Sequence, residues 1–281
     1  MFKKVVIVVF FLGMLTSCNR TYEQAMKSSE PEFILNAADK LYEEEKWPYA
    51  IELYGRVASS FAGTEIAEEI AYKSAQANFN DKNYPLAARQ FKNFYLGFNR
   101  SEKAEEALFM SAFSYYQGSP KYNLDQTNTY EAISELQNFI DTYPTSTKVR
   151  EANQYINELQ HKLEKKYFEI AKAYYKTLRF KAASVSFSNF LTDFPDSDLV
   201  EEANMYLLRS RSELAINSVF DKKDLRLRDA ATTYRLFIRT YPESKFKKEA
   251  DDLMKDITRE TAEHAELLSQ IKEQENKNTQ S

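Results

Sequence analysis

The sequence predicts an all-α protein, a solenoid of about five helix pairs stacked in series. Three observations lead to this fold class. A pattern of small, aromatic and hydroxyl residues recurs five times along the chain. Apolar residues return at helical spacing, as at Phe33, Ala37, Ala38 and Leu41. The 281 residues include only 5 glycines and 7 prolines, which is typical of helices joined by few tight turns.

The recurring pattern is clearest between Ala183 and Ser197. An alanine is followed four residues later by a large apolar residue, eleven residues later by an aromatic one, and then by a hydroxyl residue. The alanines are Ala50, Ala87, Ala132, Ala183 and Ala230, and the hydroxyl residues are Thr64, Ser101, Ser146, Ser197 and Ser244. Alanine lets paired helices approach closely, the aromatic rings fill the space between pairs, and the hydroxyl caps the next helix. This arrangement is typical of the tetratricopeptide (TPR) repeat.

The start of the chain predicts a lipoprotein signal peptide over residues 1–17. Two lysines precede an apolar stretch, 5–12, that is too short to span a bilayer. The stretch Leu15-Thr-Ser-Cys18 resembles a bacterial lipobox, which predicts S-diacylglycerol and an N-acyl chain on Cys18. The alternative is an ordinary signal peptide with an incidental cysteine. No other cofactor is expected.

The mature chain divides into four predicted segments. Residues between 147 and 176 contain neither proline nor glycine, so we expect one continuous helix of about 45 Å joining repeats three and four. We expect a lipidated flexible linker over 18–31 and a polar tail over 258–281. Between them, TPR repeats 1–3 over 32–146 form the substrate-binding half. The connecting helix and repeats 4–5 over 147–257 form the scaffold half.

Composition argues against most chemical activities. The net charge of -4 and the pI near 5.5 leave no basic surplus for nucleic acid. The 2 histidines and 1 cysteine form no metal-ligand motif. The sequence has no glycine-rich phosphate loop and no Gly-x-Ser-x-Gly elbow. We therefore expect no metal site and no enzyme.

A peptide-binding groove is the expected functional feature. The first helix of each TPR pair lines the concave face, and Ala38, Ala75 and Ala112 mark equivalent positions on the first three of these helices. Counting from these alanines gives an aromatic stripe that consists of Tyr42, Tyr72, Phe79, Phe109, Phe113 and Tyr116. Such a stripe suits an extended or helical peptide with apolar side chains. The alternative is that some of these rings pack between helices.

The chain resembles the BamD (ComL) family, the lipoproteins of the outer-membrane β-barrel assembly machinery. The lipobox, five repeats, the long helix and the segments Leu136–Ser146 and Leu163–Tyr175 carry the resemblance. It implies an outer-membrane lipoprotein that faces the periplasm. It further implies that the C-terminal repeats hold a periplasmic domain of the barrel-forming subunit. The N-terminal repeats would recognise the C-terminal signal of unfolded outer-membrane proteins, which usually ends in an aromatic residue.

Two other functions remain open from the sequence. One is a periplasmic TPR adaptor of the cell-envelope, division or peptidoglycan machinery, although no sustained heptad pattern precedes Phe33. The other is a carbohydrate-capturing lipoprotein on a TPR scaffold. The single tryptophan argues against the latter, because sugar-binding platforms favour exposed tryptophan.

Overall fold

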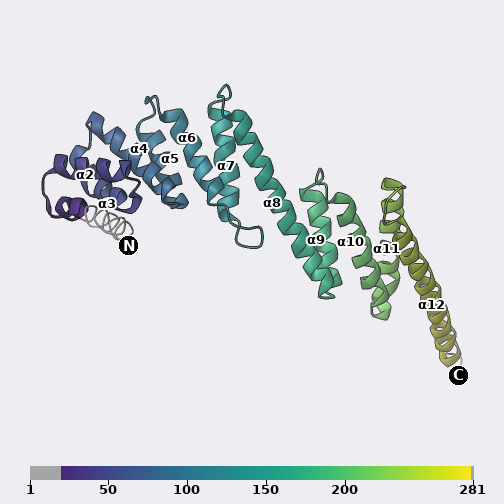
Figure 1. The fold of residues 1–281 in the computed structure, drawn as a ribbon. Helices are drawn as coiled ribbons and strands as arrows, with labels where there is room; N and C mark the ends of the chain where they lie inside the picture. Colours follow the sequence, from purple (N-terminus) through teal and green to yellow (C-terminus); the bar gives the residue numbers. More distant parts are fainter. Residues whose placement is uncertain (1–19, 280–281) are drawn as a thin grey trace, which may run out of the picture. The chain divides into compact units, whose positions relative to one another are not determined.

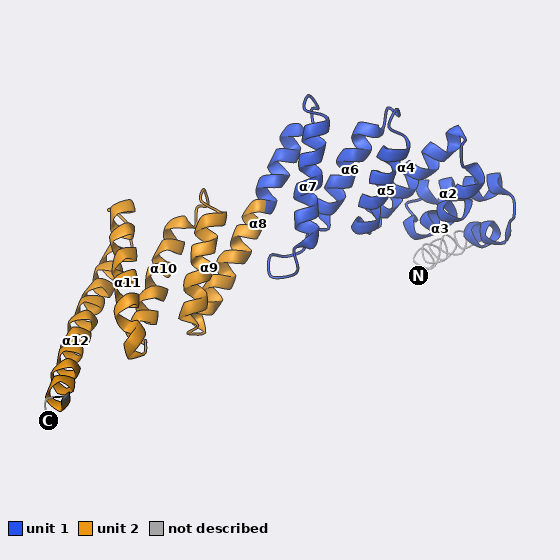
Figure 2. Ribbon diagram, turned by 180° about the vertical axis from the view of Figure 1, so that it is seen from behind, with its two compact units in different colours: residues 1–159 blue, residues 160–281 orange. Residues whose placement is uncertain are grey.

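The computed structural model describes residues 20–279, which are helical apart from short turns and loops (Figure 1). The all-α prediction is confirmed. The chain forms two compact units, residues 1–159 and 160–281 (Figure 2). The division falls inside a long helix, rather than at the boundary between 146 and 147 that we expected from the sequence.

Unit 1 contains three helix pairs and the start of a long helix. The pairs are α2 (Pro31–Glu43) with α3 (Trp47–Val57), α4 (Glu65–Asn80) with α5 (Tyr84–Gly97), and α6 (Ala104–Gln117) with α7 (Thr127–Thr142). A short 3-10 turn, η1 (Ala58–Phe61), follows α3. Each helix packs on the next one along the chain, as expected for a repeat array.

Unit 2 repeats the same arrangement. Its helices are the remainder of α8 (Val149–Lys176), α9 (Phe180–Asp193), α10 (Val200–Ile216), α11 (Phe220–Thr240) and α12 (Lys247–Thr279). The continuous helix predicted between repeats three and four is therefore present as α8, which is about 42 Å long at 1.5 Å per residue. Within unit 2, α8 acts as the first helix of a pair, because Phe168 and Ala171 pack against Ala183 and Phe187 of α9.

The second-helix alanines do what the repeat pattern predicts. All five, Ala50, Ala87, Ala132, Ala183 and Ala230, are fully buried. Their large partners Tyr54, Phe91, Leu136 and Phe187 are also fully buried, while Tyr234 is half-buried. A methyl group at the alanine position leaves room for the neighbouring helix, and the large side chain four residues later fills the space beside it. The repeat pattern is thus a packing pattern.

The hydroxyl residue that closes each pattern joins two successive helix pairs. Its side-chain oxygen donates a hydrogen bond to a glutamate on the first helix of the preceding pair. These bonds, which we call the Ser–Glu clasps, are Ser101–Glu68 at 2.6 Å, Ser146–Glu105 at 2.5 Å, Ser197–Glu164 at 2.8 Å and Ser244–Glu201 at 2.6 Å. Two clasps lie in each unit. Thr64, at the same place in the first repeat, donates to the carbonyl of Phe61 instead.

The clasp serines also shape the turn that precedes a helix, but they are not N-caps. Ser101 Oγ accepts the backbone N–H of Lys103, and Ser146 Oγ accepts that of Lys148. Helix α6 begins only at Ala104, and its N-cap residue makes no side-chain hydrogen bond. The serine therefore fixes a turn two residues long before the helix, a local role that hydroxyl side chains commonly take.

Both ends of the described chain are helical, and the N-terminal one differs from expectation. Residues 20–27 form a helix instead of a flexible linker, because Ala25 is fully buried and Tyr22 and Met26 pack on the core of the first pair. The expected polar tail is the helical end of α12. There His264 is 6% exposed and its ring packs at a tilt against that of Phe220, with centroids 4.4 Å apart. A few apolar contacts with a neighbouring helix suffice to keep these polar segments helical, because packing stabilises a helix more than its own residue preferences do.

Replacing Ser146 tests whether the clasps stabilise the array. Ser146→Ala removes one hydrogen bond to a carboxylate and one turn contact, so we expect unfolding to become easier by about 1–2 kcal/mol. Urea unfolding followed by circular dichroism measures this loss. Ser146→Thr keeps the hydroxyl and serves as the matched control, and we expect it to remain close to the wild type. Equal stability of the alanine variant would show that the clasp adds nothing.

Candidate functional site

The first helices of unit 1, whose surface we call the groove face after the peptide groove that the sequence predicts, carry a cluster of four aromatic rings. Phe79 of α4 lies 5.6 Å from Phe113 of α6, and Phe113 lies 5.3 Å from Tyr155 of α8, measured between ring centroids. Tyr116 stacks on Tyr155 at 4.1 Å. All four rings are half-buried. We call Phe79, Phe113, Tyr116 and Tyr155 the aromatic cluster. It joins first helices of successive pairs, where a bound peptide would meet them.

The two tyrosine hydroxyls of this cluster are held by carboxylates. Tyr116 donates to Glu158 and Tyr155 donates to Glu151, both at 2.5 Å. Burial, together with the hydrogen bond to Glu158, raises the pKa of Tyr116 to about 12. Burial and the bond to Glu151 likewise raise the pKa of Tyr155. Both hydroxyls therefore stay protonated, and the rings are fixed in place for stacking contacts.

Tyr155 was not among the residues predicted from the sequence. The sequence predicts the stretch that contains it as a connection between repeats, which would offer no groove positions. Residues 149–159 of α8 in fact pack on α6 and α7 through Ala152, Ile156 and Leu159, as the first helix of a further pair would. Tyr155 follows Ala152 by three residues, and this small residue at helical spacing is the signal that could have revealed it.

Tyr72 and Phe109, two of the predicted groove residues, lie in the core. They are only 7% and 3% exposed. Each stands four residues after a clasp glutamate, a position that faces the next helix pair. The lysine two residues after the clasp serine covers each ring. Lys103 lies 4.9 Å from the Tyr72 centroid, and Lys148 lies 4.5 Å from that of Phe109. The structure thus leaves little of either ring for a ligand.

Tyr42 stands between these two groups. It is half-buried, and its hydroxyl donates to Gln76 Oε1 at 2.9 Å, which links the first pair to the second. Its ring meets the edge of Trp47 at 5.2 Å. Burial raises the pKa of Tyr42, although the nearby Lys73 opposes the rise. Tyr42 therefore extends the groove face of unit 1 into the first repeat. Its ring makes no direct contact with the aromatic cluster.

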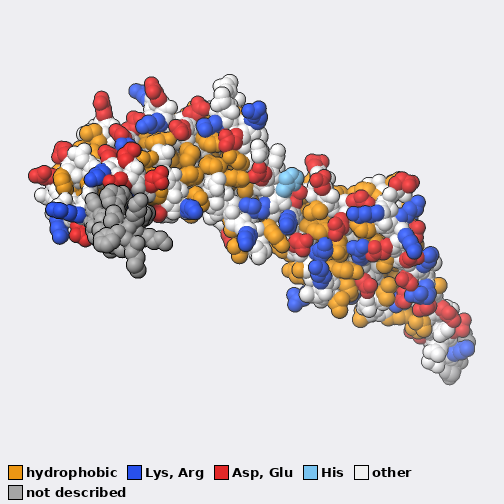
Figure 3. Space-filling view, in the orientation of Figure 1, with side chains coloured by type: hydrophobic (Ala, Val, Ile, Leu, Met, Phe, Trp, Pro, Cys, Tyr) orange, Lys and Arg blue, Asp and Glu red, His pale blue; other side chains and the backbone are white. Residues whose placement is uncertain are grey.

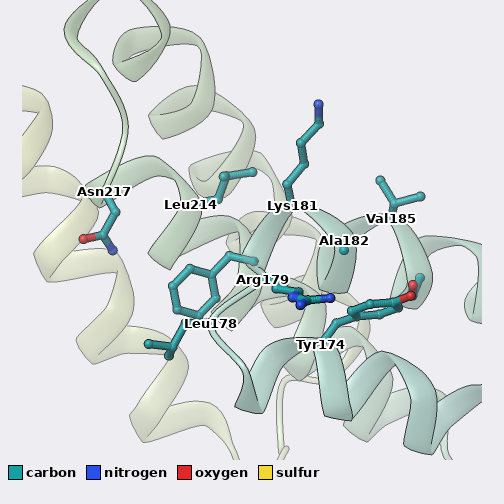
Figure 4. A pocket seen from close by; sticks show the side chains of 10 residues that line it. Tyr174, Leu178, Arg179, Lys181, Ala182, Val185, Leu214 and Asn217 are labelled. Atoms are coloured by element: carbon teal, nitrogen blue, oxygen red, sulfur yellow. The ribbon is translucent and has the colours of Figure 1, made fainter.

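Unit 2 contains a separate open pocket of about 780 Å³ (Figure 4). It lies at the turn between α8 and α9 and reaches α10 through Leu214. Its apolar wall includes Leu178 and Val185, which are 73% and 53% exposed. In the space-filling view, hydrophobic side chains are exposed among lysines and arginines over α9 and α10 (Figure 3). Exposed branched apolar side chains around a hollow are typical of a docking surface.

The backbone at this pocket is strained. Leu178 has a φ of 58°, in the left-handed region that large side chains rarely adopt. Glu45 and Lys82 adopt the same conformation in the corresponding turns of unit 1, with φ of 57° and 63°. The turn geometry therefore belongs to the repeat, whereas the apolar side chain in it belongs to this site. What distinguishes this turn from the other two is therefore the exposed leucine in place of a charged residue.

Two cations lie at the same pocket. Arg179 and Lys181 line it and are exposed, and neither is paired with a carboxylate within residues 20–279. Arg209 of α10, by contrast, is paired with Glu249 at 2.6 Å. The pocket thus combines an apolar wall with uncompensated positive charge. This arrangement suits a protein surface with an apolar residue beside carboxylates.

The described residues 20–279 hold neither a metal site nor a membrane-spanning helix. No group of histidine, cysteine, aspartate and glutamate side chains among them could hold a metal ion. None of their helices is long and apolar enough to cross a membrane. Cys18, the predicted lipidation site, lies outside the described residues. The candidate sites are therefore the groove face of unit 1 and the pocket of unit 2.

Comparisons with known proteins point to one family. The family model described as "YfiO: Outer membrane lipoprotein" matches residues 27–225 and, in a second match, 169–277. No curated protein matches the chain.

Two solved structures are similar in fold. The TPR2AB domain of yeast Sti1 in its complex with pHSP90 is 12% identical in sequence and has a TM-score of 0.38. The match covers 81% of this chain and 98% of that one. A TPR repeats protein from Bacteroides fragilis is 14% identical, with a TM-score of 0.37 over 89% and 98%.

Substitutions to alanine distinguish core rings from groove rings. Tyr72→Ala or Phe109→Ala leaves a large cavity between helix pairs, so we expect a loss of about 3–5 kcal/mol in unfolding free energy. Tyr116→Ala removes a half-buried ring, and we expect a loss of about 1 kcal/mol. Chemical unfolding of the full chain measures both. Similar small losses at all three positions would place Tyr72 and Phe109 on the surface after all.

Proposed function

Because the chain belongs to the YfiO family, the BamD-type outer membrane lipoproteins, we propose that it is a non-enzymatic scaffold and substrate receptor for β-barrel assembly. The single observation that carries the proposal is the family match, which extends across both units. Lipid chains on Cys18 anchor the protein in the outer membrane, facing the periplasm. The two sites described above then take two different partners.

The groove face of unit 1 receives the C-terminal signal of unfolded outer-membrane proteins. Such a segment is extended, alternates apolar and polar side chains, and usually ends in an aromatic residue. The aromatic cluster offers half-buried rings on successive helices, and a further ring from the peptide can stack against them with centroids about 4.5–7 Å apart. The hydroxyls of Tyr116 and Tyr155 are already bound to carboxylates, so the cluster selects apolar side chains more than polar ones.

The pocket of unit 2 receives the periplasmic domain of the barrel-forming subunit. Leu178 and Val185 supply exposed apolar surface, and Arg179 supplies a charge that no carboxylate of the described chain neutralises. An interface with an apolar centre and a charged rim gains affinity from the centre and orientation from the rim. We therefore expect an apolar residue with neighbouring carboxylates on the partner domain.

Peptide binding tests the groove. A double substitution of Tyr116→Ala and Tyr155→Ala should weaken binding of a peptide ending in an aromatic residue by about 1–3 kcal/mol per anchor. Fluorescence anisotropy with a labelled peptide from a barrel protein C-terminus measures the affinity. Tyr130→Ala, on α7 and 47% exposed, is the control because it lies on a second helix. Affinity unchanged by the double substitution, in a folded protein, would remove the aromatic cluster from the site.

Co-purification from detergent-solubilised membranes tests the pocket. The combined change Leu178→Glu and Arg179→Glu reverses the charge and removes apolar surface, so we expect recovery of the barrel-forming subunit to fall at least about tenfold. Leu96→Glu, on α5 of unit 1 and 63% exposed, is the matched control. Recovery of division or peptidoglycan enzymes by the wild type, without the barrel-forming subunit, would instead favour the adaptor function.

A further inference from the structure

The helix that precedes the first repeat is fixed to it. Residues 20–27 pack along α3, where the rings of Tyr22 and Tyr49 have centroids 4.7 Å apart and Tyr22 donates to Glu52 at 2.5 Å. The Arg56 guanidinium donates to the carbonyls of Met26 and Ser28 at the end of this helix. Those carbonyls have no partner within the helix, so the arginine satisfies them. The helix therefore moves with the first repeat as one body.

This helix begins close to the lipid attachment point. Arg20 already lies in the helix and is two residues from Cys18, and two residues of fully extended chain span at most about 7 Å. If Cys18 carries lipid, as proposed above, the start of the helix cannot move far from the membrane surface. A short tether to a docked helix restrains the first repeat, whereas a long flexible linker would leave it free.

The contacts of this helix show which edge of the repeat is restrained. Tyr22 meets residues near the start of α3, and Met26, one turn later, meets Arg56 near its end. The two helices thus run in the same direction, so Arg20 lies beside the first turn of α3. Trp47 and Tyr49 occupy that turn and point to different sides of it, since Tyr49 meets Tyr22 whereas Trp47 meets Tyr42 of α2; they share the N-terminal end of α3, which is the edge meant here. Tyr49 is 38% exposed, and Trp47 and Tyr22 are half-buried.

Tryptophan and tyrosine favour the interface of a bilayer, because each ring has an apolar body and a polar group that hydrogen-bonds to water or headgroups. The charges near this edge decide which lipids fit. Glu43, Glu44 and Glu45 end the preceding helix, and Lys46 pairs with Glu44 at 2.7 Å. Arg20, exposed at the same edge, offsets part of the remaining acidic charge of Glu43 and Glu45. The edge therefore has no surplus of positive charge for anionic headgroups and suits a zwitterionic phospholipid such as phosphatidylethanolamine.

We infer that the edge formed by Tyr22, Trp47 and Tyr49 lies at the membrane interface and seats the first repeat on zwitterionic headgroups. This inference rests on the proposed lipid anchor but goes beyond it, since anchoring alone sets no orientation. The edge also adjoins the groove face of unit 1, because Trp47 meets Tyr42 edge-on at 5.2 Å. The first repeat of that face is consequently held beside the membrane surface.

Trp47 is the only tryptophan of the chain, so its fluorescence reports on this edge alone. The lipidated full chain is reconstituted into phosphatidylethanolamine and phosphatidylcholine vesicles that carry bromine near the headgroup end of the acyl chains. We expect at least about twofold quenching of the Trp47 emission relative to vesicles without bromine, as for an interfacial ring. Emission unchanged by bromine, from protein that floats with the vesicles, would overturn the inference and leave the lipid anchor intact.

Two variants separate the tether from the anchor. A Gly/Ser insertion of about 20 residues between Asn19 and Arg20 lengthens the tether by about 25 Å, so it should retain flotation and lose most of the quenching. Equal quenching in this variant would overturn the role of the short tether. Cys18→Ala should lose both flotation and quenching. If the wild type itself fails to float, the proposed anchor is wrong, and the inference fails with it.

Discussion

The hydrogen bond between a clasp serine and a glutamate of the preceding pair recurs at every described junction between pairs except the first, and the register of those pairs depends on it. It occurs twice in each unit, always from the turn before one first helix to the body of the previous one. A bond to a carboxylate is stronger than one between neutral groups, and it fixes direction as well as distance. Buried alanines allow the helices to approach, and the clasp determines how far along the helix each new pair begins.

The position at which each new pair begins also determines which side chains of the first helices face the next pair. Four residues after each clasp glutamate, the side chain points into the next pair. Tyr72, Phe109, Phe168 and Met205 all occupy this position, and all are buried. The groove face receives other positions of the same helices, among them those of Phe79, Phe113 and Tyr116. One turn of helix therefore separates a residue that holds the fold together from one that can hold a ligand.

The two candidate sites differ in character because the repeats differ outside these packing positions. In unit 1 the groove face carries stacked rings whose hydroxyls are bound to carboxylates. In unit 2 the turn before α9 exposes Leu178 in a strained conformation beside Arg179. Rings suit a flexible apolar peptide, and a fixed hollow with charge suits a folded domain. The helix before the first repeat carries a third candidate surface, since Arg56 fixes it to α3 and a lipid chain on Cys18 would then orient the first repeat as well as anchor it.

The sequence by itself determined the repeat, the order of the helices, the long α8 and the position of the lipobox, because helical periodicity and small-residue spacing are local properties of the chain. The tertiary structure alone decided which aromatic rings are core and which are groove. A first helix in a stacked array is apolar on more than one side, so periodicity cannot say which side meets the next pair. Tyr155, the docked helix over residues 20–27 and the pocket beside Leu178 likewise depend on contacts between segments distant in sequence.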